Sequence, residues 1–120
     1  MWERSSREEG HKLSDLRGYY EDRENVQFLD VREPYEWEAG HIEGAVHIPL
    51  ASVMAGGERD RLDPSRPVIV VCRVGNRSEL AALMLQARGL EAHNMEGGME
   101  AWAAAGLPYA ASDGSPGRVA

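Results

Sequence analysis

The single cysteine of this 120-residue chain, Cys72, stands among residues that favour a reactive thiol. It ends an apolar run and is followed by Arg73, Gly75, Asn76 and Arg77. Nearby arginines and the N-terminus of a following helix lower the pKa of a cysteine and stabilise its thiolate. A cysteine that merely fills the core, the other common role of a buried thiol, needs none of these neighbours. The pattern therefore predicts a nucleophile at Cys72.

The residues after Cys72 predict a tight loop that leads into a helix. Gly75 supplies the backbone freedom that the turn requires, and Asn76 with Glu79 three residues later has the pattern of a capping box. The N–H groups of such a loop can point at Cys72 as an anion-binding nest. The spacing between Cys72 and Arg77 is one residue shorter than in protein tyrosine phosphatases. This smaller loop suits a single transferred sulfur atom better than a tetrahedral phosphate.

The elements that must position this loop alternate between strand and helix patterns. Residues 68–72 are branched and apolar without polar alternation, which predicts a central parallel strand. A helix over 78–88 is apolar over most of its circumference and is expected to pack against the sheet. The other expected strands are 26–31, 46–48 and 91–95, and the other expected helices are 13–23, 34–39, 50–55 and 99–105.

Alternating strands and crossover helices predict an α/β fold, a central parallel sheet with helices on both faces. Cys72 then lies at the carboxyl ends of the strands, where open α/β sheets bind their ligands. The length fits one domain over 13–109, between a polar N-terminal segment, 1–12, and a tail, 110–120, of small residues, Gly and Pro. Both ends are expected to be flexible.

Charge and cysteine content narrow the class of protein. The net charge of −7 argues against nucleic acid or an anionic membrane as a partner. One cysteine excludes an intramolecular disulfide. Residues 1–12 are rich in charge and have no apolar core of a signal peptide, and no apolar run approaches the length of a membrane span. We therefore expect a cytoplasmic protein.

Three segments of the chain resemble the rhodanese family of sulfurtransferases. The segment CRVGNRS at 72–78 is similar to the family's active-site loop, Cys-Arg-x-Gly-x-Arg-Ser. DVRE, YEW, GHI, GA and HIP, within 30–49, are similar to its amino-terminal motif, and GGMEAW with GLP, within 97–108, to its carboxyl-terminal motif. The three motifs occur in the family's order, and the resemblance runs from about Phe28 to Pro108.

The resemblance implies a rhodanese-like sheet of about five strands and a two-step exchange of sulfur. The Cys72 thiolate takes the outer sulfur of a small anionic donor, commonly thiosulfate, and the resulting persulfide gives it to cyanide, a thiol or a protein. No metal or organic cofactor is implied. The implied donor- and sulfur-binding residues are Arg73, Val74, Gly75, Asn76, Arg77 and Ser78. Val74 stands where many relatives carry Ser or Thr, so a hydroxyl contact to the donor is missing.

Several alternatives stay open. A sulfur-relay module, which takes persulfide from a protein donor, needs the same loop. The loop length argues against a phosphatase or arsenate reductase, and the intact nucleophile against a catalytically silent binding domain. Asp30 and Arg32 either help to orient the loop or form a structural ion pair, the commoner role of such charges. His41 and His47 are interpreted as structural.

Overall fold

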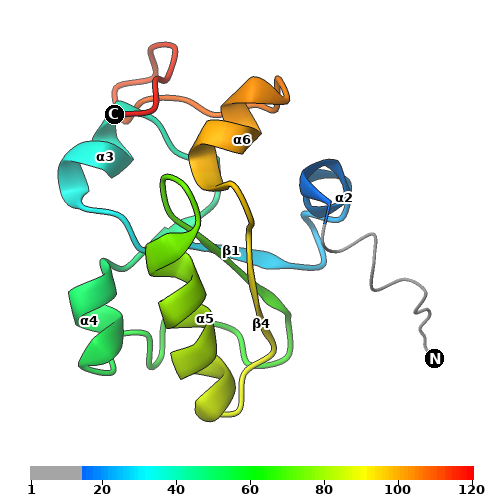
Figure 1. The fold of residues 1–120 in the computed structure, drawn as a ribbon, viewed down its shortest axis with the longest axis vertical. Helices are drawn as coiled ribbons and strands as arrows, with labels where there is room; N and C mark the ends of the chain where they lie inside the picture. The colour runs from blue at the N-terminus through cyan, green and yellow to red at the C-terminus, as the bar shows by residue number, and fades with distance from the viewer. Residues whose placement is uncertain (1–14) are drawn as a thin grey trace.

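A computed structural model describes residues 15–120 of the chain. The expected flexible segment 1–12 and the start of the helix expected at 13–23 lie outside the described residues. No described helix has the length and apolarity needed to cross a membrane. The elements, in the order drawn in Figure 1, are α2 (Leu16–Glu21), β1 (Gln27–Asp30), α3 (Pro34–Ala39), β2 (Val46–His47), α4 (Leu50–Met54), β3 (Val68–Val71), α5 (Asn76–Ala87), β4 (Ala92–Asn94) and α6 (Gly98–Ala104).

The strands form one parallel sheet in the order β2-β1-β3-β4. This confirms the predicted α/β class and places β3 in the interior of the sheet. The described residues contain four strands rather than about five. The reason is visible in the sequence, where only four segments have a strand pattern. The number five came from the resemblance, and residues 15–120 contain no fifth strand.

Side chains of β3 alternate between two hydrophobic cores, one on each face of the sheet. Val68, Val70 and Cys72 pack in the core that α4 and α5 cover. Ile69 and Val71 pack in the core that α2 and α6 cover. Because both faces are covered, the strand has no polar alternation. The two covering helices α4 and α5 lie side by side in Figure 1.

Helix α5 begins earlier than expected and is less buried. Gly75, with a φ of 114°, is its N-cap, so Asn76 already lies inside the helix and its side chain makes no cap. The capping box predicted from Asn76 and Glu79 is therefore wrong. Leu80 and Leu83 are 46% and 58% exposed, because only a narrow stripe of α5 faces the sheet.

The C-terminal segment, 110–120, differs from the flexible tail expected for it. Ala110 forms an antiparallel bridge with the residues that follow α3. The Arg118 N–H donates to the carbonyl of Ala39 at 2.9 Å, and Val119 packs against the core beneath α6. These backbone hydrogen bonds and one apolar contact hold the segment against the domain although its composition resembles that of a linker.

Candidate active site

Cys72 lies at the base of the loop that joins β3 to α5. Its residue is 1% exposed, and its sulfur is surrounded by donors from the loop. The backbone N–H of Gly75 donates to Sγ at 3.0 Å, and that of Ser78 at 3.4 Å. The Ser78 hydroxyl lies 3.2 Å from the same sulfur. The loop thus forms a nest of donors around one sulfur atom.

These donors decide the ionisation of the thiol. Burial desolvates the thiolate and alone would raise the pKa of Cys72. The Ser78 hydroxyl and the N–H groups of Ser78, Gly75 and Val74 act in the opposite direction, because they bind the charged form. Their combined effect is larger, and the pKa of Cys72 lies below its ordinary value. A larger fraction of the thiol is therefore ionised at neutral pH.

Glycines allow the backbone to approach the sulfur from two sides. Gly75 occupies a left-handed conformation that side chains avoid, and this turn aims its N–H at Cys72. Gly98, at the start of α6 with a φ of 59°, lies against the active-site loop: an added Cβ would clash with the Cys72 carbonyl oxygen and lie 2.5 Å from that of Arg73. The close approach lets the Met99 N–H donate to the Cys72 carbonyl at 2.8 Å.

Asn94, at the end of β4, is a site residue that the sequence analysis missed. Its Nδ2 donates to the Gly75 carbonyl at 3.1 Å, and its Oδ1 accepts a hydrogen bond from the Ser78 hydroxyl. Asn94 thereby holds both a loop carbonyl and the hydroxyl that faces the sulfur. The only sequence signal was its place at the carboxyl end of a strand, the edge where Cys72 also lies.

Both arginines of the loop are engaged by carboxylates. Arg77 forms a bidentate ion pair with Glu36 of α3, at 2.7 and 2.9 Å. The hydrogen bonds from Arg77 hold the pKa of Glu36 below its ordinary value against the opposing effect of burial, and the same contacts raise the pKa of Arg77. Arg73 pairs with Glu100 of α6. Through these two arginines, the loop is connected to helices α3 and α6.

Asp30 and Arg32 pair with each other and are both buried. The Nε and Nη2 atoms of Arg32 donate to the Asp30 carboxylate at 2.9 and 2.8 Å, and Nη2 also donates to the Gly40 carbonyl at 2.7 Å. Within residues 15–120, neither side chain bonds to the loop after Cys72. Their contacts are those of a structural ion pair that stabilises the turn between β1 and α3.

The two histidines near this turn contact carbonyl oxygens. His41 Nδ1 lies 2.7 Å from the Trp37 carbonyl, and His47 Nε2 lies 2.8 Å from the Arg32 carbonyl. Both rings also stack on the Trp37 indole, at centroid distances of 3.6 and 4.7 Å. In the described part of the chain, no three His, Cys, Asp or Glu side chains gather as metal ligands.

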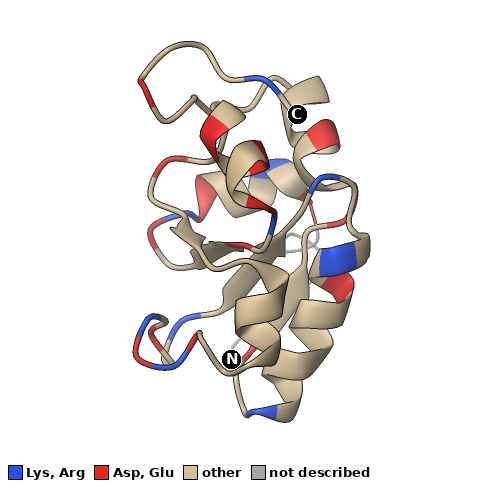
Figure 2. Ribbon diagram, turned by 90° about the vertical axis from the view of Figure 1, so that its left-hand side faces the viewer, with Lys and Arg blue, Asp and Glu red and all other residues tan. Residues whose placement is uncertain are grey.

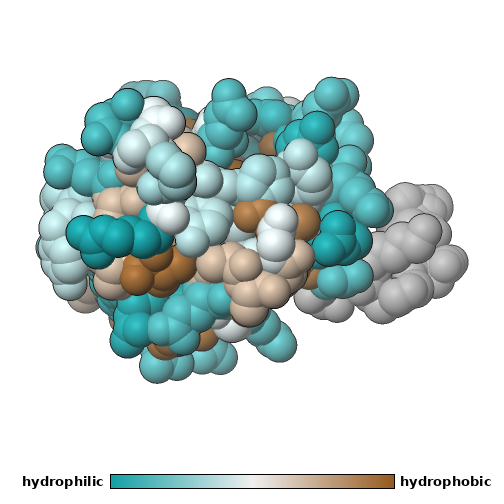
Figure 3. All heavy atoms as spheres, turned by 90° about the horizontal axis from the view of Figure 1, so that it is seen from above, coloured by the Kyte–Doolittle hydropathy of each residue, from teal (hydrophilic) through white to brown (hydrophobic). Residues whose placement is uncertain are grey.

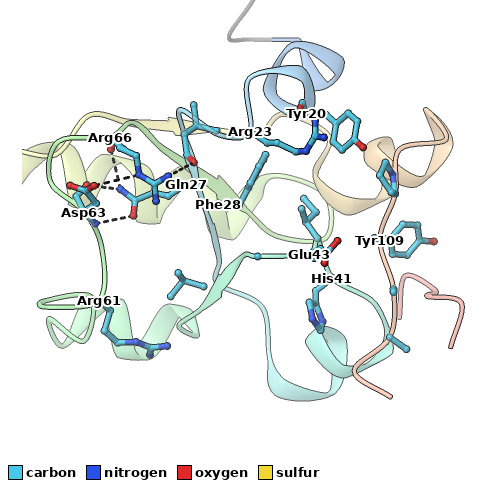
Figure 4. Close-up of a pocket in the computed structure, with 17 residues that line it drawn as sticks. Tyr20, Arg23, Gln27, Phe28, His41, Glu43, Arg61, Asp63, Arg66 and Tyr109 are labelled. Atoms are coloured by element: carbon cyan, nitrogen blue, oxygen red, sulfur yellow. Dashed lines mark hydrogen bonds and ion pairs between the residues drawn. The ribbon is translucent and has the colours of Figure 1, made fainter. Parts of the chain in front are cut away.

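A cavity of about 960 Å³ lies away from Cys72, and no residue of the 72–78 loop lines it. Figure 4 shows it between the start of β1 and the segment after α6. Arg23 lies over the ring of Tyr20 at 4.2 Å, and Arg66 pairs with Asp63 at 3.5 Å. The charged groups of this cavity are thus partly engaged with one another, and the cavity is separate from the loop at Cys72.

Residues 12–105 match the family described as the rhodanese-like domain. The match covers most of the sequence, and the chain belongs to this family. The structure agrees with this assignment. The rhodanese-related protein of Thermoplasma volcanium superposes with a TM-score of 0.74 at 32% identity, over 79% of this chain and 93% of that one.

Two curated relatives are named for sulfur chemistry. MoeZ of Mycobacterium tuberculosis, whose name includes adenylyltransferase and sulfurtransferase, is 32% identical over 90 residues, which are 74% of this chain and 23% of MoeZ. YrkF of Bacillus subtilis, whose name includes sulfur carrier protein, is 38% identical over 80 residues, which are 66% of this chain and 42% of YrkF. The chain spans less than half the length of these two relatives.

Proposed function

We propose that Cys72 takes up a sulfane sulfur as a persulfide and passes it to a thiophilic acceptor. The observation that carries this proposal is the set of donors around Sγ, with the Gly75 N–H at 3.0 Å and the Ser78 N–H at 3.4 Å. They favour the thiolate, which is the nucleophilic form of cysteine. A thiolate formed in advance needs no separate general base.

With thiosulfate, the donor expected from the sequence, the reaction balances in two steps. The Cys72 thiolate attacks the outer sulfur, the sulfur–sulfur bond of thiosulfate breaks, and sulfite leaves with the bonding electrons. An acceptor such as cyanide then attacks the outer sulfur of the Cys72 persulfide, which releases thiocyanate and restores the thiolate. The N–H groups of Asn76 and Arg77 lie in the first turn of α5 and have no acceptor within the helix. We expect them to bind the transferred sulfur.

A sulfur-relay domain, which loads from a protein persulfide, is the second candidate. It is supported by the relative named as a sulfur carrier protein and by the carboxylates that engage both loop arginines. The two candidates share the Cys72 persulfide and differ in the donor.

Intact-protein mass spectrometry tests the shared step. Wild type and Cys72→Ser are incubated with thiosulfate or an alkyl persulfide, and cyanide is added afterwards. We expect wild type to gain one sulfur atom and to lose it to cyanide as thiocyanate. Since Cys72 is the only cysteine, Cys72→Ser has no thiol left to load. A wild-type protein that gains no sulfur from either donor would contradict the proposal.

A further inference from the structure

Both loop arginines are paired with carboxylates, which reduces the positive charge that they present to a donor. Arg77 uses both Nη atoms on Glu36, whose side chain is only 3% exposed. Arg73 is paired through Nη1 with Glu100. At these contact distances each carboxylate cancels most of the field that its arginine would exert on a bound anion. The loop thus lacks the concentrated positive charge that attracts a small dianion.

The remaining surroundings do not supply the missing charge. Val74, in the middle of the loop, is 39% exposed and offers no side-chain donor to a sulfonate oxygen. Figure 2 shows the blue arginine segments of this region interrupted by red acidic segments. The whole chain carries a net charge of −7, which repels anions at longer range.

The groups that do face Sγ belong to the backbone and to Ser78. They can contact the transferred sulfur atom, which every sulfane donor has in common, and not the rest of the donor. Val74 of the same loop is 39% exposed, and Tyr35, which precedes Glu36 on α3, is 66% exposed; both add apolar surface. Seen from above in Figure 3, the molecule carries small hydrophobic patches among a largely hydrophilic surface. An organic donor therefore finds contacts here that thiosulfate cannot use.

We propose that Glu36 and Glu100 make this site select sulfane donors of low negative charge, namely an alkyl persulfide carried by a thiol, over the dianion thiosulfate. The inference rests on the proposed function, because it concerns the donor of the same Cys72 persulfide. The Cys72 thiolate attacks the outer sulfur of the donor R–S–SH. The bond between the two donor sulfurs breaks, R–S⁻ leaves with the bonding electrons, and the outer sulfur joins Cys72 with its proton.

Three donors separate the effect of charge from that of chemistry. They are thiosulfate, the persulfide of cysteamine and the persulfide of 3-mercaptopropionate; the last two have similar lengths and opposite terminal charges. The quantity measured is kcat/KM for the loading of Cys72. It is obtained by quenching the reaction at set times and determining the loaded fraction from the intact mass. We expect wild type to prefer the cysteamine persulfide over the 3-mercaptopropionate persulfide by about five- to tenfold, and over thiosulfate by more. Added salt should reduce the preference, because it screens charge.

The carboxylates are tested by Glu100→Gln and Glu36→Gln. Each variant frees an arginine, so the ratio of thiosulfate to cysteamine-persulfide kcat/KM should rise about fivefold or more. Glu91→Gln is the matched control, because it removes the same charge at the opposite end of β4, and it should leave the ratio at the wild-type value. Thermal unfolding checks that Glu36→Gln is folded; if it is not, Glu100→Gln decides, since its ion pair is half-exposed.

The outcomes distinguish the two proposals. Equal use of the three donors by wild type, or an unchanged ratio in folded Glu100→Gln and Glu36→Gln, would overturn the donor selectivity while leaving the Cys72 persulfide in place. Failure of all three donors to load Cys72 would instead contradict the proposed function.

Discussion

A single hydroxyl proton with two competing acceptors controls the thiol. Ser78 Oγ lies 3.2 Å from Cys72 Sγ and is also hydrogen-bonded to Asn94 Oδ1. A hydroxyl carries one proton, so it can serve the thiolate or the amide oxygen but not both. While Cys72 is a thiol, its S–H can donate to Ser78 as Ser78 donates to Asn94. Loss of the thiol proton is favoured when the Ser78 hydroxyl turns to the sulfur.

Replacing Ser78 by alanine should therefore raise the pKa of Cys72. The wild-type thiol has a lowered pKa, so its thiolate persists to lower pH than that of an ordinary cysteine. Without the Ser78 hydroxyl, the pH profile of alkylation by iodoacetamide should shift to higher pH, and the rate at pH 7 should fall several-fold. Ser52→Ala, on α4, is the control. An unchanged profile in Ser78→Ala would contradict this role.

Asn94→Asp should act in the same direction by a different route. Its carboxylate accepts a stronger hydrogen bond from the Ser78 hydroxyl than an amide oxygen does, and it places a negative charge near the thiolate. The alkylation profile should again move to higher pH. The folded state can be verified by thermal unfolding, and a profile that moves to lower pH would refute the competition between the two acceptors.

The two parts of the site differ in how far the sequence could predict them. Cys72, Gly75 and Ser78 are close in sequence, and their types alone predict a loop of donors around a thiol. Asn94 contacts the loop only because β4 pairs beside β3, and no local pattern marks it. The carboxylate partners Glu36 and Glu100 were likewise not predicted, because they lie on helices distant in sequence from the loop.

The site is also a junction of elements, since α3, α5 and α6 all meet the loop. α6 contributes backbone donors, and its approach depends on Gly98, whose missing side chain leaves room for the Cys72 and Arg73 carbonyls. α3 contributes Glu36, which holds α5 through Arg77. The position of the thiol is therefore coupled to the packing of two helices.

Gly98→Ala should separate α6 from the loop. The added Cβ meets backbone oxygen atoms, which cannot move aside as a flexible side chain would. We expect a loss of about 2 kcal/mol or more in the free energy of unfolding, measured by urea denaturation, together with slower loading of Cys72. Gly114→Ala has a positive φ of 86° but no neighbour within 4 Å, so it measures the conformational cost alone. Equal losses in both variants would contradict the role of close approach.

The ion pair between Glu36 and Arg77 should make stability depend on pH. Hydrogen bonds from Arg77 hold the folded-state pKa of Glu36 below its ordinary value of 4.5. The stabilisation is thus fully present above about pH 4.5 and is lost as the pH falls through the lower folded-state value. Glu36→Gln should be less stable than wild type by roughly 1–3 kcal/mol at pH 7, and the difference should shrink in acid. A difference independent of pH between 7 and 3 would contradict the ion pair as its cause.

At the scale of the whole molecule, two hydrophobic cores lie on opposite faces of one sheet. The C-terminal segment packs against the core that α2 and α6 cover. The alternation along β3 and the α/β class followed from the sequence, because burial on both faces requires an unbroken apolar strand. The packing of the segment 110–120 did not, since its contacts are backbone hydrogen bonds that any residue type can make. The exposure of Leu80 and Leu83 on α5 was not predicted either, because the sequence does not show that only a narrow stripe of this apolar helix faces the sheet.

Removal of residues 112–120 should lower the stability of the domain. It eliminates two backbone hydrogen bonds, from the Ser112 N–H to the Glu38 carbonyl and from the Arg118 N–H to the Ala39 carbonyl. It also exposes the part of the hydrophobic core that Val119 contacts. At about 1 kcal/mol for each lost contact, Tm should fall by roughly 5–15 °C, as measured by calorimetry. A truncated chain with the wild-type Tm would show that the segment contributes nothing to folding.

The thiol that reacts is at the same time a member of the hydrophobic core, at 1% exposure. We expect a persulfide formed there to keep its inner sulfur within the core, so that an acceptor approaches the outer sulfur only from the side of the loop. The access that the loop allows to the sulfur is then expected to decide which acceptors can discharge the persulfide.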